Sequence, residues 1–206
     1  MNKSVKDALI LCLITLVAGL LLGGVYEITK NPREKQEEKA KNEAYMAVFN
    51  DAKDFETLKI NDMSKIDAAL KENNITSKNV IIDEIAAAKD ASEKIIGYVV
   101  NVTSKEGFGG DISFSVGVNL DGTINGVSIL KISETAGLGM NATNKEFLNQ
   151  YTLGSSGLFV VNKDEAAKGN NIDAISGATI TTKAMTKGVN AAKIAALVII
   201  GESEVQ

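Results

Sequence analysis

The chain has no histidine and no tryptophan, and its 206 residues include only one proline and one cysteine. The absence of histidine excludes a Ser-His-Asp triad, a Cys-His pair and an imidazole metal site. A single cysteine excludes an intrachain disulfide, a CxxC redox pair, a thiolate zinc site and a cysteine-held iron–sulfur cluster. Any redox or transfer chemistry therefore needs a borrowed cofactor, and we expect neither a metal site nor a catalytic side chain.

The charge balance is mildly acidic, with 22 Lys and Arg against 26 Asp and Glu, a net charge of −4. Nucleic-acid-binding proteins usually carry a basic face, so this balance argues against a nucleic-acid partner. At roughly 100–200 residues per domain, the length suits one domain with an appendage.

An uncharged, strongly apolar run extends from Ala8 to Tyr26. A helix of that length covers about 28 Å, close to the roughly 30 Å of bilayer hydrocarbon. The run is longer than the ~7–15 residue core of a signal peptide, and no small-x-small cleavage site follows it. The pattern predicts an uncleaved transmembrane anchor over residues 1–29, rather than a signal peptide or a buried core helix. Cys12 lies inside this span as a small packing residue.

The charges around the anchor do not settle its orientation. Two lysines precede the span, and five basic residues between Lys30 and Lys41 follow it. Counted simply, the positive-inside rule places the following domain in the cytoplasm. Acidic residues alternate with these basic ones, however, and long domains are translocated largely regardless of charge.

Helix-forming residues of both charges follow Pro32. Glu and Lys alternate at near-helical spacing, which predicts a helix over residues 33–58. A polar, loop-like patch around residues 73–77 comes next. We expect residues 30–78 to form a helical stalk that leads into the domain.

From Asn79 the pattern changes to that of β-strands. The clearest strand is Asp111–Leu120, in which apolar and polar residues alternate strictly. Asp121-Gly122 is a tight-turn signal, and Thr123–Ile132 is the returning strand of a hairpin. Two earlier strands are expected at Val80–Ile85 and Ile95–Val102.

The remaining pattern predicts a short helix at Asn144–Tyr151, a short strand at Leu158–Val161 and a last helix at Ile180–Ile200 that Gly201 ends. The apolar end of the last helix is too short to span a bilayer and is interpreted as core.

The expected fold class is therefore α+β, an antiparallel sheet with flanking helices, preceded by one transmembrane helix. The domain would cover residues 79–201, with a tail at 202–206.

Three glycine-rich segments are candidate binding sites. Gly107–Gly110 is an ordinary loop or a wall that lets a planar ligand approach the backbone beside Phe108. Ser133–Met140 combines hydroxyls, a carboxylate and glycines, which suits a polar heterocycle. Asp173–Thr179 opens onto the last helix, whose N-terminus favours a phosphate. Alternatively, this segment only supplies Ser176 or Thr179 as the N-cap of that helix.

The third segment reads DAISGAT and resembles the Dxx(S/T)GAT flavinylation motif. That motif belongs to the FMN-binding domain shared by the G subunit of Rnf complexes and the C subunit of sodium-pumping NADH:quinone reductases. The anchor, the stalk, the Gly-Phe-Gly-Gly segment and a Glu-Thr-x-Gly-Leu-Gly loop follow in the family's order over about residues 8–200. One departure is Ala136, where the family loop usually has proline. The length and the single anchor favour the Rnf family member.

The resemblance implies that FMN is joined through its phosphate to the hydroxyl of Thr179. It further implies that Asp173 is recognised by a flavin transferase. Ser176, Gly177 and Ala178 would flank the phosphate, while Glu134, Thr135, Gly137, Leu138, Phe108 and Gly109 would surround the flavin ring.

By the same resemblance, the chain is a membrane-anchored electron-carrying subunit of an ion-translocating ferredoxin:NAD oxidoreductase, and not a complete enzyme alone. Its partners would be membrane and iron–sulfur subunits, a flavin transferase and the lipid bilayer, with the domain on the outer face of the cytoplasmic membrane. The alternatives are the equivalent subunit of a sodium-pumping quinone reductase and a tethered adaptor without covalent flavin.

Overall fold

The computed structural model describes residues 3–60, 63–162 and 170–203. Contacts divide the chain into two compact units, Met1–Asn42 and Glu43–Gln206. The first unit is helical, and the second, called the domain unit below, contains the sheet.

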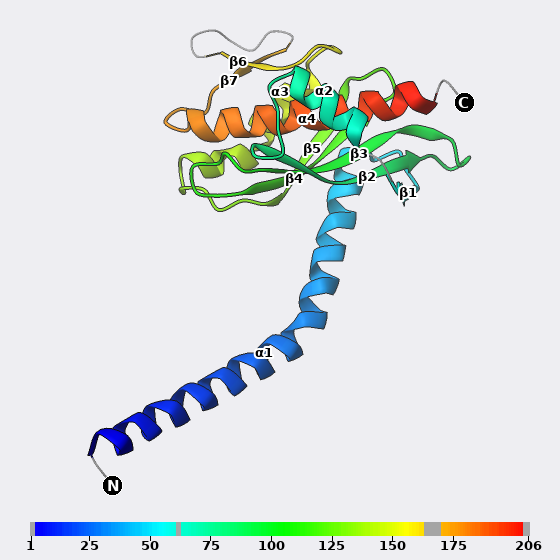
Figure 1. The fold of residues 1–206 in the computed structure, drawn as a ribbon. Helices are drawn as coiled ribbons and strands as arrows, with labels where there is room; N and C mark the ends of the chain where they lie inside the picture. Colours follow the sequence, from blue (N-terminus) through cyan, green and yellow to red (C-terminus); the bar gives the residue numbers. More distant parts are fainter. Residues whose placement is uncertain (1–2, 61–62, 163–169, 204–206) are drawn as a thin grey trace. The chain divides into compact units, whose positions relative to one another are not determined.

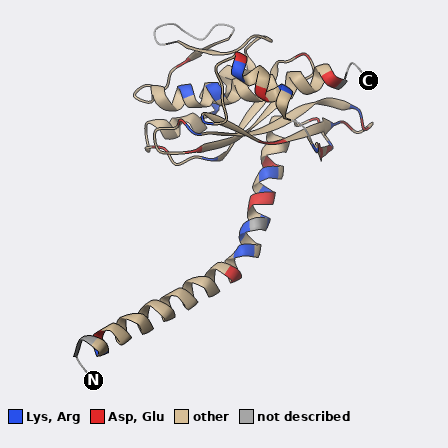
Figure 2. Ribbon diagram, viewed as in Figure 1, with Lys and Arg blue, Asp and Glu red and all other residues tan. Residues whose placement is uncertain are grey.

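Helix α1 runs without interruption from Lys3 to Val48, so the expected anchor and the expected stalk belong to one helix. Pro32 lies inside it, where a proline costs about 3 kcal/mol relative to alanine. The stretch from Ala8 to Tyr26 lacks charged side chains, whereas both signs follow it (Figure 2).

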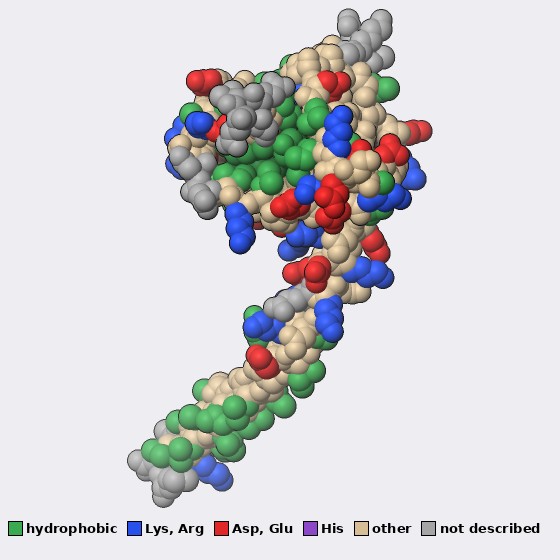
Figure 3. Space-filling view, turned by 90° about the vertical axis from the view of Figure 1, so that its right-hand side faces the viewer, with side chains coloured by type: hydrophobic (Ala, Val, Ile, Leu, Met, Phe, Trp, Pro, Cys, Tyr) green, Lys and Arg blue, Asp and Glu red, His purple; other side chains and the backbone are tan. Residues whose placement is uncertain are grey.

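Apolar side chains cover the N-terminal stretch of α1 (Figure 3). The large ones from Val5 to Ile28 are 47–78% exposed, which suits a lipid environment. Two helices of the described residues are long and apolar enough to cross a membrane, α1 and α4 (Thr179–Ser203). The apolar window of α4 is mostly buried, so α4 is a core helix, as the sequence predicted.

The domain unit is built on a five-stranded antiparallel sheet in the order β1-β2-β3-β4-β5 (Figure 1). The strands are β1 (Asp54–Thr57), β2 (Val80–Lys89), β3 (Ile95–Ser104), β4 (Ile112–Asn119) and β5 (Ile124–Lys131). The hairpin of β4 and β5 confirms the alternating pattern, because the apolar side chains of β4 point into the core and leave the polar ones on the other face.

Helix α4 packs across one face of the sheet, mainly against β3, β4 and β2. Phe114, Val100, Met185 and Val189 belong to this main core and are fully buried. The smaller elements are α2 (Ser64–Glu72), the 3-10 helix η1 (Gly139–Thr143), α3 (Lys145–Thr152) and the parallel pair of β6 (Val160–Asn162) and β7 (Asn171–Asp173).

The last turn of α1 covers part of the other sheet face. Tyr45, Val48 and Phe49 pack there in a second, smaller core. The close approach needs glycine in the sheet, since a Cβ at Gly117 would lie 2.9 Å from the Val48 carbonyl oxygen. The end of α1 is therefore fixed to the central strands.

A buried polar network supports that attachment. The Tyr45 hydroxyl donates to Glu84 Oε1 (3.1 Å) and accepts from Asn101 Nδ2 (2.8 Å), and Ser115 Oγ donates to Asn101 Oδ1 (2.7 Å). Burial and the neighbouring Glu84 carboxylate raise the pKa of Tyr45. The phenol therefore stays protonated and keeps donating.

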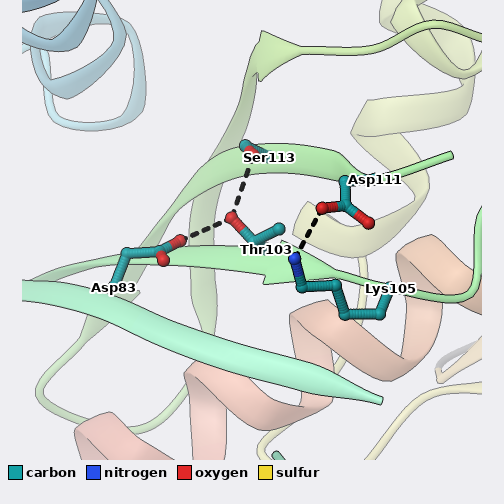
Figure 4. Close-up of polar contacts among 5 residues, drawn as sticks. All are labelled: Asp83, Thr103, Lys105, Asp111 and Ser113. Carbon is teal, nitrogen blue, oxygen red and sulfur yellow. Dashed lines mark hydrogen bonds and ion pairs between the residues drawn. The ribbon is translucent and has the colours of Figure 1, made fainter. Parts of the chain in front are cut away.

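Farther along the same face, the side chains are polar and more exposed. Thr103 Oγ1 donates to Asp83 Oδ2 (2.6 Å) and lies 2.9 Å from Ser113 Oγ, while Lys105 pairs with Asp111 at the strand ends (Figure 4). These contacts join β2, β3 and β4 on the solvent side.

The expected helix over residues 33–58 was wrong beyond Val48. Asp54–Thr57 forms the edge strand β1, in which Phe55 pairs with Ala88 of β2. Its charged residues resemble those of a solvated helix, but an exposed edge strand tolerates charge equally well. The sequence analysis named no separate helix before the polar patch, but α2 forms at Ser64–Glu72 and buries Ile66 and Leu70, whereas residues 73–77 form neither helix nor strand.

Gly201 does not end the last helix, which continues to Ser203. Glu202 and Ser203 of the expected tail are helical, and residues 204–206 lie outside the described residues. The salt bridge of Glu202 with Lys65 (2.7 Å) accompanies this extra turn.

Candidate flavin-binding site

Three glycine-rich segments that are distant in the sequence meet around one cavity of ≈ 350 Å³. Seven of the predicted site residues line it: Phe108, Glu134, Thr135, Leu138, Gly177, Ala178 and Thr179. Gly139, Ile180 and Thr181 complete the wall. The fold therefore assembles the segments that the sequence analysis singled out.

Glu134 joins the first two segments. Its Oε1 accepts the backbone N–H of Phe108 (2.8 Å) and its Oε2 accepts that of Gly109 (3.1 Å). The two backbones are in close contact, since a Cβ at Gly109 would lie 2.1 Å from the Ser133 carbonyl oxygen. The carboxylate that we expected beside a flavin ring thus has its hydrogen-bonding capacity directed to the loop.

The second segment turns sharply into η1. The Thr135 carbonyl accepts the N–H groups of Leu138 and Met140 (both 3.1 Å). This turn places the Leu138 side chain, which is 43% exposed, at the cavity. Gly137, with a φ of 75°, lies in the turn and does not line the cavity.

The third segment is closed by Thr182, a residue of the first turn of α4. Thr182 Oγ1 accepts the N–H of Ile175 (3.1 Å) and donates to the Ala178 carbonyl (3.0 Å). Ala178 N–H also bonds to the Ile175 carbonyl (2.9 Å), and Gly177 adopts a φ of 72° between them. The hydroxyl of Thr182 therefore holds the turn that precedes α4.

Thr179 is the first residue of α4 and is partly buried at the cavity wall. Among the described residues, its hydroxyl makes no hydrogen bond. The neighbouring residues Thr181 and Thr182 are 1% and 0% exposed, so their hydroxyls are less accessible than that of Thr179. The helix N-terminus favours a nearby anion by about 0.3–1 kcal/mol.

Four of the predicted residues lie outside the cavity wall: Gly109, Gly137, Asp173 and Ser176. Ser176 is exposed on the turn. Asp173 ends β7, and its N–H donates to Gln150 Oε1 (2.7 Å). Ile180 and Thr181 directly follow the motif, but they were not predicted to line the site.

The composition of the wall fits a flat ligand that carries a phosphate. Phe108, Leu138 and Ile180 supply apolar surface, and the start of α4 supplies the anion-favouring end. The volume lies at the lower end of the roughly 300–1,000 Å³ of small-molecule sites. The described residues contain no group of acidic or cysteine side chains suited to a metal ion.

Comparisons with known proteins identify the family of the chain. Residues 107–193 match the family model described as FMN-binding domain. The chain is 34% identical to the G subunit of the proton-translocating ferredoxin:NAD(+) oxidoreductase complex of Clostridium ljungdahlii, over 91% of this chain and 86% of the relative. It is 33% identical to the G subunit of the Na(+)-translocating complex of Acetobacterium woodii, over 90% and 87%.

The fold also has a relative among solved structures. The C subunit of the Na(+)-translocating NADH-quinone reductase from Parabacteroides distasonis superposes with a TM-score of 0.50 at 18% identity, covering 80% of this chain and 91% of that chain. This likeness concerns the fold alone. From the sequence identities and their coverage, the chain belongs to the family of the G subunits of ion-translocating ferredoxin:NAD(+) oxidoreductase complexes, with an FMN-binding domain at residues 107–193.

Proposed function

We propose that this protein carries electrons within an Rnf-type complex on an FMN that is joined through its phosphate to the Thr179 hydroxyl. The observation that carries the proposal is the position of that hydroxyl, which lies at the first residue of α4, beside the cavity and without a hydrogen bond among the described residues. Family membership supports the redox role.

The surroundings of Thr179 suit a phosphoester. Gly177 and Ala178 are small and leave the hydroxyl open to a flavin transferase, and the start of α4 stabilises the remaining negative charge. Ser176 is exposed on the turn and Asp173 is half-buried at the end of β7, and neither lines the cavity, so we assign Asp173 to recognition by the transferase rather than to contact with the ring.

When bound, FMN supplies the reversible gain and loss of electrons. The chain supplies the binding surface. Phe108, Leu138 and Ile180 exclude water from the ring, Thr135 offers a hydroxyl, and Glu134 keeps the Phe108 loop in place. Because a carrier performs no bond-breaking step, this chain is not a complete enzyme by itself.

We further propose that α1 anchors the protein by a single membrane pass over residues 1–29, with residues 30–78 leading to the domain at 79–201 on the outer face of the cytoplasmic membrane. The exposed apolar side chains of α1 support insertion in lipid. Other membrane and iron–sulfur subunits would exchange electrons with the flavin.

The attachment site is tested by intact mass and in-gel flavin fluorescence of the full chain, co-expressed with a flavin transferase. We expect the mass of one FMN less one water, and complete loss of the adduct in Thr179→Val. Thr181→Val is the matched control, because it removes a hydroxyl of the same cavity and should keep the adduct.

The absence of any adduct on the unaltered chain favours the adaptor alternative. An adduct that persists in Thr179→Val refutes the site but not the cofactor. Co-purification from native membranes separates the two complexes, since the ferredoxin-linked complex brings iron–sulfur subunits.

The proposed topology has its own test. In a Cys12→Ser background, Ser92→Cys adds an exposed thiol in the turn between β2 and β3. A membrane-impermeant maleimide should label it in intact cells. Labelling only after cell lysis refutes the outer location.

A further inference from the structure

A second and larger cavity, of ≈ 660 Å³, lies beside the candidate flavin site. We call it the β6 hollow. Ile180 lines both cavities, so the β6 hollow begins one residue after Thr179. Its apolar wall consists of Ile75, Leu158, Phe159, Val160, Val161 and Ile180.

Side chains of α4 hold the segment that leads into β6 by four hydrogen bonds. Asn190 Oδ1 of α4 accepts a hydrogen bond from the Phe159 N–H (2.8 Å), and Asn190 Nδ2 donates one to the Phe159 carbonyl (2.9 Å). Lys193 Nζ donates to the carbonyls of Ser155 (2.7 Å) and Gly157 (2.6 Å) just before this segment. The segment that leads into β6 is therefore pre-organised against α4, and a partner would not have to order it.

The charged residues that line the hollow differ in whether they form an ion pair. Lys187 pairs with Glu106, which also accepts from Asn79 Nδ2 (2.7 Å). Lys183 is exposed and has no partner among the described residues. Because Lys187 and Glu106 neutralise each other, Lys183 is the one unpaired charge among the described residues that line the hollow, and it lies one turn after Thr179.

Large apolar side chains face water at this place. Val160 is 61% and Ile180 54% exposed. Neither belongs to the membrane anchor, so lipid does not account for them, and Val160, unlike Ile180, does not line the candidate flavin site either. Apolar groups grouped around a cavity and rimmed by charge are typical of a protein-binding surface.

We infer that the β6 hollow is the docking site of another subunit of the complex, which places an apolar side chain against Val160 and Ile180 and a carboxylate near Lys183. The inference rests on the proposed function. Electron transfer becomes much slower with distance, so a partner that exchanges electrons with a flavin at Thr179 has to dock close to it. The β6 hollow is contiguous with that site and is already shaped.

The test uses the full chain in its native membranes. A photo-crosslinking residue, p-benzoylphenylalanine, replaces Val160 in one variant and Leu120 in a control. Leu120 is also exposed, but it adjoins the β4–β5 turn, where a Cβ at Gly122 would lie 3.0 Å from Leu197. Residues 180 and 197 are about 25 Å apart along α4.

We expect ultraviolet light to link the Val160 variant, and not the Leu120 variant, to one other subunit of the complex. Adding Lys183→Glu should lower the yield roughly tenfold, as a lost charge pair would. Lys94→Glu is the matched charge control, placed beyond the far end of β3, and should leave the yield unchanged.

Equal yields at both positions, products with lipid alone, or no intermolecular product overturn the docking site, and an unchanged yield in Lys183→Glu overturns the charge contact. The mass of the FMN adduct is measured on the same samples. A specific crosslink on a chain without FMN sustains the docking site and refutes the proposed function, so the two failures are distinguishable.

Discussion

Gly177 offers the sharpest test of how the turn before α4 is built. Its φ of 72° lies in the left-handed region, and a Cβ at this position would lie 2.9 Å from Leu138 Cδ2. Gly177→Ala therefore introduces two separate costs. One is backbone strain, and the other is a contact with the second glycine-rich segment.

The magnitude follows from those two costs. A left-handed non-glycine residue costs about 1–2 kcal/mol. Leu138 Cδ2 is the end of a flexible side chain, and moving that side chain off its rotamer adds about 0.5–1.5 kcal/mol. The sum of roughly 1.5–3.5 kcal/mol corresponds to a fall in Tm of about 3–14 °C for a chain of this size.

Substitutions at two other glycines separate the cost of backbone strain from the cost of the contact with Leu138. Gly137 has a φ of 75° with no atom within 4 Å of a built Cβ, so Gly137→Ala should show the backbone cost alone, about 2–8 °C. Gly201 lies in α4 with equally open surroundings, so Gly201→Ala should be neutral or stabilising.

The assay is urea and thermal unfolding of the full chain in detergent, followed by tyrosine fluorescence. The reasoning is refuted when Gly177→Ala is as stable as the unaltered chain. In a Leu138→Ala background, the cost of Gly177→Ala should shrink to that of Gly137→Ala. If it stays the same, Leu138 is not the contact that matters.

Three further predictions concern single side chains. Glu134→Gln keeps one acceptor oxygen where the carboxylate used two, so the free energy of unfolding should fall by about 1–2 kcal/mol, measured in urea. An unchanged value would contradict the stabilising role of the two hydrogen bonds from Phe108 and Gly109 to Glu134. Burial lowers the pKa of Lys193 to about 8 from 10.5, so between these values the unfolded chain binds more protons than the folded one. Stability relative to Lys193→Met should therefore rise from pH 8 to 10.5 in urea titrations, and a flat difference would rule out the burial effect. Tyr45→Phe removes a buried hydroxyl from the network and should cost about 1–3 kcal/mol in the same assay, whereas Tyr26→Phe, on an exposed ring, should cost nothing.

The sequence predicted best where local pattern and tertiary demand agree. The β4–β5 hairpin carries strict alternation and an Asp-Gly turn, and both describe one sheet face turned to a core. The last helix was located within a few residues, because its apolar content suits burial under the sheet. The DAISGAT motif likewise indicated the segment that forms one wall of the cavity.

The sequence analysis missed the features that depend on tertiary contacts. β1 exists because β2 offers it an edge, and nothing within Asp54–Thr57 distinguishes it from a charged helix. The hydrogen bond between Glu134 and the Phe108 N–H connects residues 26 positions apart, so no local pattern could reveal it. The role of Thr182 depends on a turn that exists only once Gly177 adopts its left-handed conformation.

The assembly of the cavity from three distant segments sets an order of events in the life of the chain. Its walls come from residues 108, 134, 135, 138, 139 and 177–181, and Thr179, Ile180 and Thr181 belong to α4, which follows all five strands of the sheet in the chain. Before α4 has docked on the sheet, the cavity has no third wall. A ligand seated in it is thus evidence that α4 has already docked on the sheet.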